Sequence, residues 1–185
     1  DETINQSINS NTISKIISKS NSLPGIKVDT GAKALSSSKE EKITEGLDGL
    51  RERLNEYYKL GARFTKWRAV YNISKKYPSE LAVKANAHAL ARYAALVQEA
   101  KMVPIVEPEV LMDGEHNIMK CYEVTSNVLK ECYKELKLHN VNLRGTILKP
   151  NMILPGTKSK DRSNSTEIAK LTLKCLKENV PNEVP

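Results

Sequence analysis

The sequence lacks any apolar run of the roughly 18 residues that a membrane-spanning helix needs, so no membrane span is expected. Its beginning also lacks a basic segment followed by an apolar one, which argues against a secretory signal peptide. Cysteine is scarce: Cys121, Cys132 and Cys175 lie far apart and form neither a C-x-x-C pair nor a cluster with histidine. This pattern argues against a disulfide framework or a zinc site and favours a reducing, cytoplasmic compartment.

Nucleic-acid and dinucleotide-binding motifs are absent as well. The net charge is +7, but the basic residues are spread among acidic ones. No helix-turn-helix, zinc-finger or aromatic RNA-binding motif is present, so nucleic acid is not an expected partner. We interpret the positive charge either as lysine-rich, solvated helix faces or as attraction for a polyanion or a phosphorylated metabolite. The three histidines have no partner at ligand spacing and are interpreted as surface or helix positions.

The length of 185 residues suits a single domain, 1–185, with a real hydrophobic core. The chain starts with Asp1 rather than Met and enters helix-like sequence at once. We therefore expect it to be an internal part of a longer polypeptide.

Four short segments have the composition of β-strands and recur about every 40 residues. They are Gly25–Asp29, Arg63–Arg68, Val103–Glu109 and Gly145–Pro150. Helix-length apolar patterns fill the gaps, at residues 43–57, 79–100, 118–136 and 165–176, with a weaker one at 4–17. The segment Thr30–Lys39, with three consecutive serines, is expected to be a loop.

Alternation of strand and helix predicts parallel βαβ units in an α/β fold. Two architectures fit, an open doubly wound sheet and a closed (β/α)8 TIM barrel. No G-x-G-x-x-G follows a strand, which makes the dinucleotide-binding sheet less favourable. Eight units of this length would need about 320 residues, within the range of such barrels. The chain therefore resembles an incomplete barrel with about four βα units.

Each predicted strand carries charged side chains at its C-terminal end, where barrel enzymes place catalytic groups. Residues two apart in a strand share a face, so the charges of one strand can point into one cavity. The set consists of Lys27, Asp29, Lys66, Arg68, Glu107, Glu109 and Lys149. Charges are costly to bury unless they are paired, so four such strands in succession indicate an acid/base site with affinity for anions.

A lysine that attacks a carbonyl must be neutral, and burial or a neighbouring cation favours its neutral form. Lys149 follows Ile147 and Leu148, so we expect it to be the most desolvated lysine, with Lys66 as the neighbouring cation. Glu107 could then move protons. Arginine, a planar fork, and lysine, a point charge, both suit phosphate.

Several segments in order resemble class I fructose-bisphosphate aldolase, over essentially the whole chain. They are PGIKVD, EGLDGLRERLNEYYKLGARFTKWR, LARYAALVQ, VPIVEPEVLMDGEH, GTILKPNMILPG and VPNEVP. The resemblance implies strands 3 to 6 of a (β/α)8 barrel, no metal or other cofactor, and a homotetramer. It also implies reversible cleavage of fructose 1,6-bisphosphate into dihydroxyacetone phosphate and glyceraldehyde 3-phosphate.

The resemblance assigns the catalytic roles by motif. Lys149, in ILKPNM, corresponds to the Schiff-base lysine, and Glu107, the first glutamate of IVEPE, to the general acid/base. Glu109 would position and polarise the active-site lysines, and Lys66 would assist carbinolamine chemistry and substrate binding.

The substrate's phosphate end would be bound by Arg68 and by Lys27 of GIKVD, with Asp29 as a neighbour whose role is less defined. Thr65 stands where alanine is usual in the family motif, a change we expect to be tolerated.

The missing barrel strands would leave open sheet edges, so the 185-residue chain alone is expected to be poorly soluble and inactive. An alternative, non-catalytic function is a scaffold role such as actin binding, which the net charge of +7 and the resemblance both allow.

Overall fold

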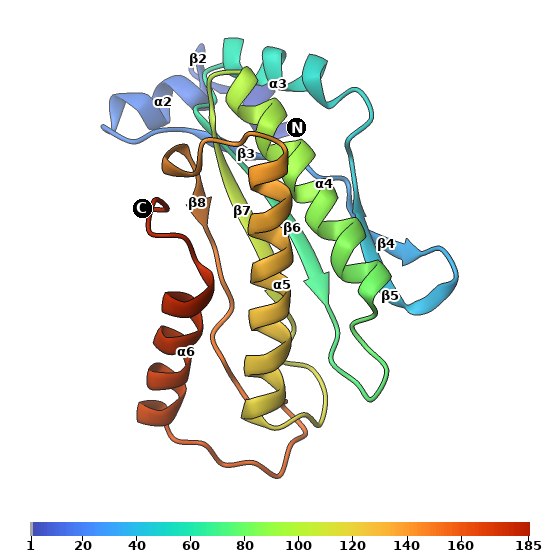
Figure 1. Cartoon of the computed structure of the whole chain (residues 1–185). Coiled ribbons are helices and arrows are strands. Elements are labelled where there is room, and N and C mark those ends of the chain that lie inside the picture. The colour runs from blue at the N-terminus through green and yellow to red at the C-terminus, as the bar shows by residue number, and fades with distance from the viewer. Residues whose placement is uncertain (1) are drawn as a thin grey trace.

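The computed structural model describes residues 2–185, and its centre is a four-stranded sheet. The strands are β3 (Gly25–Lys27), β6 (Phe64–Tyr71), β7 (Val103–Val110) and β8 (Ile147–Leu148), in that order across the sheet. Every neighbouring pair is parallel, which confirms the predicted βαβ units. The order follows the chain, so each crossover leads to the adjacent strand, as Figure 1 shows.

Helices cover one face of this sheet. They are α3 (Leu50–Lys59), α4 (Glu80–Glu99), α5 (Ile118–Leu138) and α6 (Ser165–Asn179). The helix α4 packs on β6 and β7, α5 packs on β7, and α6 packs on α5 (Figure 1). Three of the helices begin at a polar cap, Ser79, Asn117 or Asn164, whose side chain accepts a backbone N–H of the first turn.

The hydrophobic core lies between the sheet and these helices. The strand β6 alternates strictly in burial, so every second side chain of it points into this core. Trp67 and Tyr71 point into the core, and the Trp67 ring lies 5.3 Å from the ring of Tyr93 on α4. Thr65 shares this face, and its hydroxyl lies 2.7 Å from the Tyr93 hydroxyl. Lys66 and Arg68 must therefore point to the opposite face, which the helices do not cover.

The segment Thr30–Lys39 is not a loop, contrary to the prediction. It contains β4 (Gly31–Leu35) and the start of β5 (Ser38–Glu45), which pair antiparallel as a hairpin (Figure 1). The predicted helix over 43–57 is correspondingly too long, because Ile43 belongs to β5. Gly46 and Gly49, both with positive φ, separate β5 from α3, so the helix starts only at Leu50.

The weaker helix prediction over residues 4–17 is correct only in part. The segment contains α1 (Glu2–Asn5), the short strands β1 (Ser7–Ile8) and β2 (Asn11–Thr12), and α2 (Ile13–Lys19). Asn9 and Ser10 have positive φ, which interrupts any helix, and Thr12 then caps α2.

Two further boundaries differ from the prediction. In the fourth strand only Ile147 and Leu148 are extended and paired, after the 3-10 turn η1 (Leu143–Gly145). The strands β6 and β7 instead run past the predicted ends, so Lys66, Arg68 and Glu107 lie within strands rather than at their tips.

Among the described residues, no helix has both the length and the apolar character required to cross a membrane.

Candidate active site

The strand register brings the predicted charged residues together on the face that the helices leave free. Lys27 lies beside Lys66, and Arg68 lies beside Glu107. The backbone N–H of Lys149 donates to the Val106 carbonyl at 2.9 Å, which holds Lys149 against β7. Side chains from four consecutive strands therefore meet over one surface.

Glu107 is the centre of this surface and is only 2% exposed. The Nζ atom of Lys66 lies 2.9 Å from one carboxylate oxygen, and the Nζ atom of Lys149 donates to the other. The Nε atom of Arg68 lies 4.0 Å from that second oxygen. A buried carboxylate needs such partners, since an unpaired buried charge is strongly unfavourable.

Each of the other two carboxylates is also paired with a cation. Arg68 donates to Glu109, and this hydrogen bond raises the pKa of Arg68. Lys27 lies 2.5 Å from Asp29, whose Oδ1 also accepts the N–H of Gly31 at 3.0 Å. A divalent cation would have to displace these ammonium and guanidinium groups, whereas a phosphorylated ligand adds negative charge to a set of four cations and three carboxylates.

The expectation that Lys149 is the most desolvated lysine is wrong for this chain. Its side chain is 58% exposed, whereas that of Lys66 is 32% exposed. The reason is the position of β8 at the edge of the described sheet, with a strand on one side only. Its nearness to Glu107 is as the sequence analysis expected.

Sequence reasoning missed the residues that hold the segment after β3 in place. Arg53, on α3, donates to the Val28 carbonyl at 3.0 Å and to the carbonyl of Gly46. The Thr44 hydroxyl donates to the Arg68 carbonyl at 2.7 Å, which ties the hairpin to β6. No sequence motif marks these contacts, because their partners are backbone carbonyls, which any residue carries.

The side chain of Asn151, two residues after Lys149, makes hydrogen bonds to two other elements. Its Oδ1 accepts the N–H of Val110 at 3.1 Å, and its Nδ2 donates to Thr125 on α5 at 3.1 Å. Asn151 thus fastens the chain after β8 to the end of β7 and to the helical layer, and so limits the positions open to Lys149.

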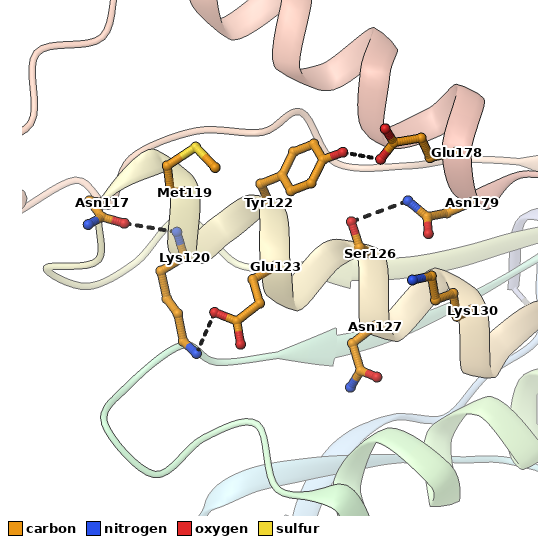
Figure 2. Close-up of a pocket in the computed structure, with 10 residues that line it drawn as sticks. All are labelled: Asn117, Met119, Lys120, Tyr122, Glu123, Ser126, Asn127, Lys130, Glu178 and Asn179. Carbon is orange, nitrogen blue, oxygen red and sulfur yellow. Dashed lines mark hydrogen bonds and ion pairs between the residues drawn. The ribbon is translucent and has the colours of Figure 1, made fainter.

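A groove of about 1040 Å³ lies elsewhere, along α5 and the end of α6 (Figure 2). Tyr122 donates to Glu178 across it, Asn179 donates to Ser126 at 3.2 Å, and the rest of the lining is mostly polar or charged. The ion pair in its lining, between Lys120 and Glu123, joins two exposed side chains of the same helix. The groove offers hydrogen bonds but no lysine beside a buried carboxylate, so the charged sheet face is the better candidate for catalysis.

Comparisons with known proteins identify the family of the chain. The family described as fructose-bisphosphate aldolase class-I matches residues 1–185. A "probable fructose-bisphosphate aldolase class 1" of Xylella fastidiosa is 52% identical over all of this chain and 56% of its own length. "Fructose-bisphosphate aldolase 4, cytosolic" of Arabidopsis thaliana is 53% identical over 88% of this chain and 42% of its own length.

A solved structure has the same fold over the whole chain. Fructose-bisphosphate aldolase from Plasmodium falciparum, in complex with TRAP and a small-molecule inhibitor, superposes with a TM-score of 0.96 at 41% identity. The match covers 100% of this chain and 54% of that one, so the chain spans about half the length of the proteins it matches. The chain belongs to the class I fructose-bisphosphate aldolase family.

Proposed function

We propose that residues 1–185 form the central part, strands 3 to 6, of a single (β/α)8 barrel domain that reversibly cleaves fructose 1,6-bisphosphate. Family membership and the parallel sheet with sequential strand order support this proposal. The strands missing from the chain would close the barrel over the charged face, which then becomes its interior. The relatives named cytosolic support a cytoplasmic location.

The observation that carries the proposal is one buried carboxylate held between two lysines. In the proposed reaction, Lys149 attacks the ketone of the substrate, for which its Nζ must be neutral. The Nζ atom already donates a hydrogen bond to Glu107, so its proton has a defined acceptor. Lys66, bound to the other oxygen of Glu107, keeps positive charge beside the reacting amine.

The addition gives a carbinolamine, which loses its hydroxyl group as water when protonated Glu107 returns a proton. The resulting iminium accepts the electron pair of the C3–C4 bond while the 4-hydroxyl loses its proton to a carboxylate of the site. Glyceraldehyde 3-phosphate leaves, the enamine takes up a proton at C3, and water then releases dihydroxyacetone phosphate and the free amine.

Arg68 and Lys27 are proposed to bind a phosphate group of the substrate. They lie on β6 and β3, on the same face as Lys66. Glu109 holds the Arg68 guanidinium in place, and Asp29 does the same for Lys27. These carboxylates fix the orientation of the two cations before the phosphate arrives, which reduces the entropy lost on binding.

Borohydride trapping tests the proposal in a polypeptide in which the remaining barrel strands are present. Incubation with dihydroxyacetone phosphate and borohydride should attach the three-carbon unit to Lys149, as located by peptide mass mapping. Lys149→Met should abolish both labelling and cleavage. Lys84→Met is the matched control, because Lys84 lies on the exposed side of α4, paired with Glu80, and should change neither.

Labelling of Lys66 in place of Lys149 would overturn the assignment of the nucleophile. Absence of any trapped adduct in an active enzyme would overturn the Schiff-base mechanism itself. Assay of the 185-residue chain alone gives a further check, since we expect it to be inactive without closure of the barrel.

A homotetramer is proposed on the family resemblance alone. The actin-binding alternative rests on the net charge of +7 and on the same resemblance, and it stays a prediction from sequence.

A further inference from the structure

A polar cluster outside the catalytic face lies where α4 packs against α5. His88 comes from α4, and Glu135 and His139 come from the last turns of α5. The Nδ1 atom of His88 lies 3.1 Å from the Glu135 carboxylate, and the Nδ1 atom of His139 lies 3.7 Å from the same oxygen. One possible ligand atom from each residue lies within 4.8 Å of the other two.

The histidines have no partner at ligand spacing in the sequence, but two of them, His88 and His139, meet in the folded chain. Glu135 and His139 are four residues apart on a helix, so they share one face. His88 reaches them only because α4 and α5 pack side by side, a tertiary contact across 47 residues of sequence. The third histidine, His116, lies in the turn after β7 and outside the cluster.

The distances suit a zinc-class ion. The Nδ1 atom of His139 also lies 2.9 Å from the backbone carbonyl oxygen of Glu135, and coordination through Nδ1 would replace that hydrogen bond. Zinc binds histidine nitrogen and carboxylate oxygen at about 2.0–2.2 Å in tetrahedral geometry, which puts neighbouring ligand atoms roughly 3.4 Å apart. The observed separations of 3.1 and 3.7 Å from the Glu135 oxygen fall on either side of that value. Two imidazoles and one carboxylate leave a fourth position for water.

The cluster is also accessible and partly fixed. The side chain of His88 is 53% exposed, whereas those of His139 and Glu135 are 22% and 15% exposed. The two imidazole rings pack edge to face with centroids 4.9 Å apart, which limits their rotation. Arg92 lines a small hollow beside His139, and its positive charge should keep the affinity moderate.

We propose that His88, Glu135 and His139 form a surface site for Zn²⁺ or a similar late first-row divalent cation that joins α4 to α5. The ion replaces the contacts of the carboxylate with the two imidazoles by three coordinate bonds across the helix pair. The site lies in the helical layer, on the other side of the sheet from Glu107, so its role is structural. It is independent of the proposed aldol chemistry.

Isothermal titration with Zn²⁺ tests the proposal in the chelator-treated polypeptide that carries the complete barrel. We expect one Zn²⁺ per chain and a rise in Tm on addition of the ion. His88→Ala, His139→Ala and Glu135→Gln should each weaken binding by at least about tenfold. Glu135→Gln is nearly isosteric, so it keeps the test decisive if a histidine variant folds poorly.

Two control variants remove a potential ligand elsewhere. His116→Gln removes the third histidine, and Glu123→Gln removes a glutamate from the same helix, paired there with Lys120. Both should bind Zn²⁺ as the unaltered protein does. No uptake by the unaltered protein at about millimolar Zn²⁺, or equal binding by the cluster variants, would overturn the proposal. Aldol cleavage by His88→Ala should be unchanged, which separates failure at this site from failure of the catalytic proposal.

Discussion

Replacement of Asn86 by alanine should loosen the hairpin formed by β4 and β5. Asn86 lies on α4, is only 1% exposed, and joins this helix to β5 through both ends of its amide. Its Oδ1 accepts the N–H of Thr44 at 3.2 Å, and its Nδ2 donates to the Lys42 carbonyl at 2.9 Å. A third hydrogen bond, to the Ala82 carbonyl at 3.1 Å, lies within α4 itself.

The loss of stability can be calculated from the buried backbone groups that alanine leaves without a hydrogen-bond partner. A buried donor or acceptor that loses its partner destabilises a protein by about 1–3 kcal/mol. Thr44 is 3% exposed, so its N–H would remain unsatisfied. Lys42 is only partly buried, so water can reach its carbonyl and reduce the second contribution. We therefore expect Asn86→Ala to lower the free energy of unfolding by about 2–4 kcal/mol.

Urea unfolding measures the global change, and hydrogen exchange at the Thr44 amide measures the local one. The amide should exchange at least about tenfold faster in the variant, because 1.4 kcal/mol corresponds to a factor of ten. Asn72→Ala is the matched control. The Asn72 side chain also donates to the hairpin, at the Glu40 carbonyl, but in an exposed position, so its loss should cost less than about 1 kcal/mol.

Equal effects of the two asparagine variants, or unchanged exchange at Thr44, would refute this account of the hairpin. The consequence extends to the catalytic face because the Thr44 hydroxyl donates to the Arg68 carbonyl. A loosened hairpin should therefore also weaken the phosphate binding that we propose for Arg68.

Three further predictions concern single contacts. Tyr93→Phe should lower the free energy of unfolding by about 1–2 kcal/mol in a urea titration, because the Thr65 hydroxyl and a carbonyl of β7 both lose a buried partner. Asp161→Ala should destabilise the protein at neutral pH, because the carboxylate accepts the N–H of Ile118 at the start of α5, a bond that lowers the pKa of Asp161. A carboxylate whose pKa is lowered by folding stabilises the protein above its ordinary pKa of 3.8, so the difference in Tm should shrink as the pH falls below about 4. Gly156→Ala should cost about 1–3 kcal/mol in the same titration, because the added Cβ would lie 2.3 Å from the backbone oxygen of the turn after β7. An unfolding midpoint for Gly156→Ala equal to that of the unaltered protein would contradict the close approach.

The sequence predicted the four main helices and the strands of the sheet because their signals are local. Ser79 and Asn117 lie directly before long apolar patterns, and each caps the helix that follows it. The hairpin of β4 and β5 was not predicted, because the contacts that stabilise it join residues far apart in the sequence. Asn86 and Arg68, which bind it, are more than 20 residues from Thr44, and three serines in a row have the composition of a loop.

That the charged side chains of neighbouring strands lie on one face was predictable, because a strand alternates its faces. Lys66 and Glu107 meet because they lie on the same face of neighbouring parallel strands, two residues apart in the register. The degree of burial was not predictable in the same way. It depends on what lies beside each strand, and the apolar neighbours of Lys149 in sequence do not determine that.

The exposure of Lys149 and the short length of β8 have one cause. A strand at the edge of a sheet is paired on one side only, so fewer of its residues are held extended and more of its surface meets water. Lys66 belongs to β6, which has neighbours on both sides, and it is the less exposed of the two lysines. Closure of the barrel would place a further strand beside β8 and turn the charged face inward. The carboxylate of Glu107 is already buried and paired, so in the proposed barrel the main change at this carboxylate would be the desolvation of Lys149, the more exposed of its two lysine partners.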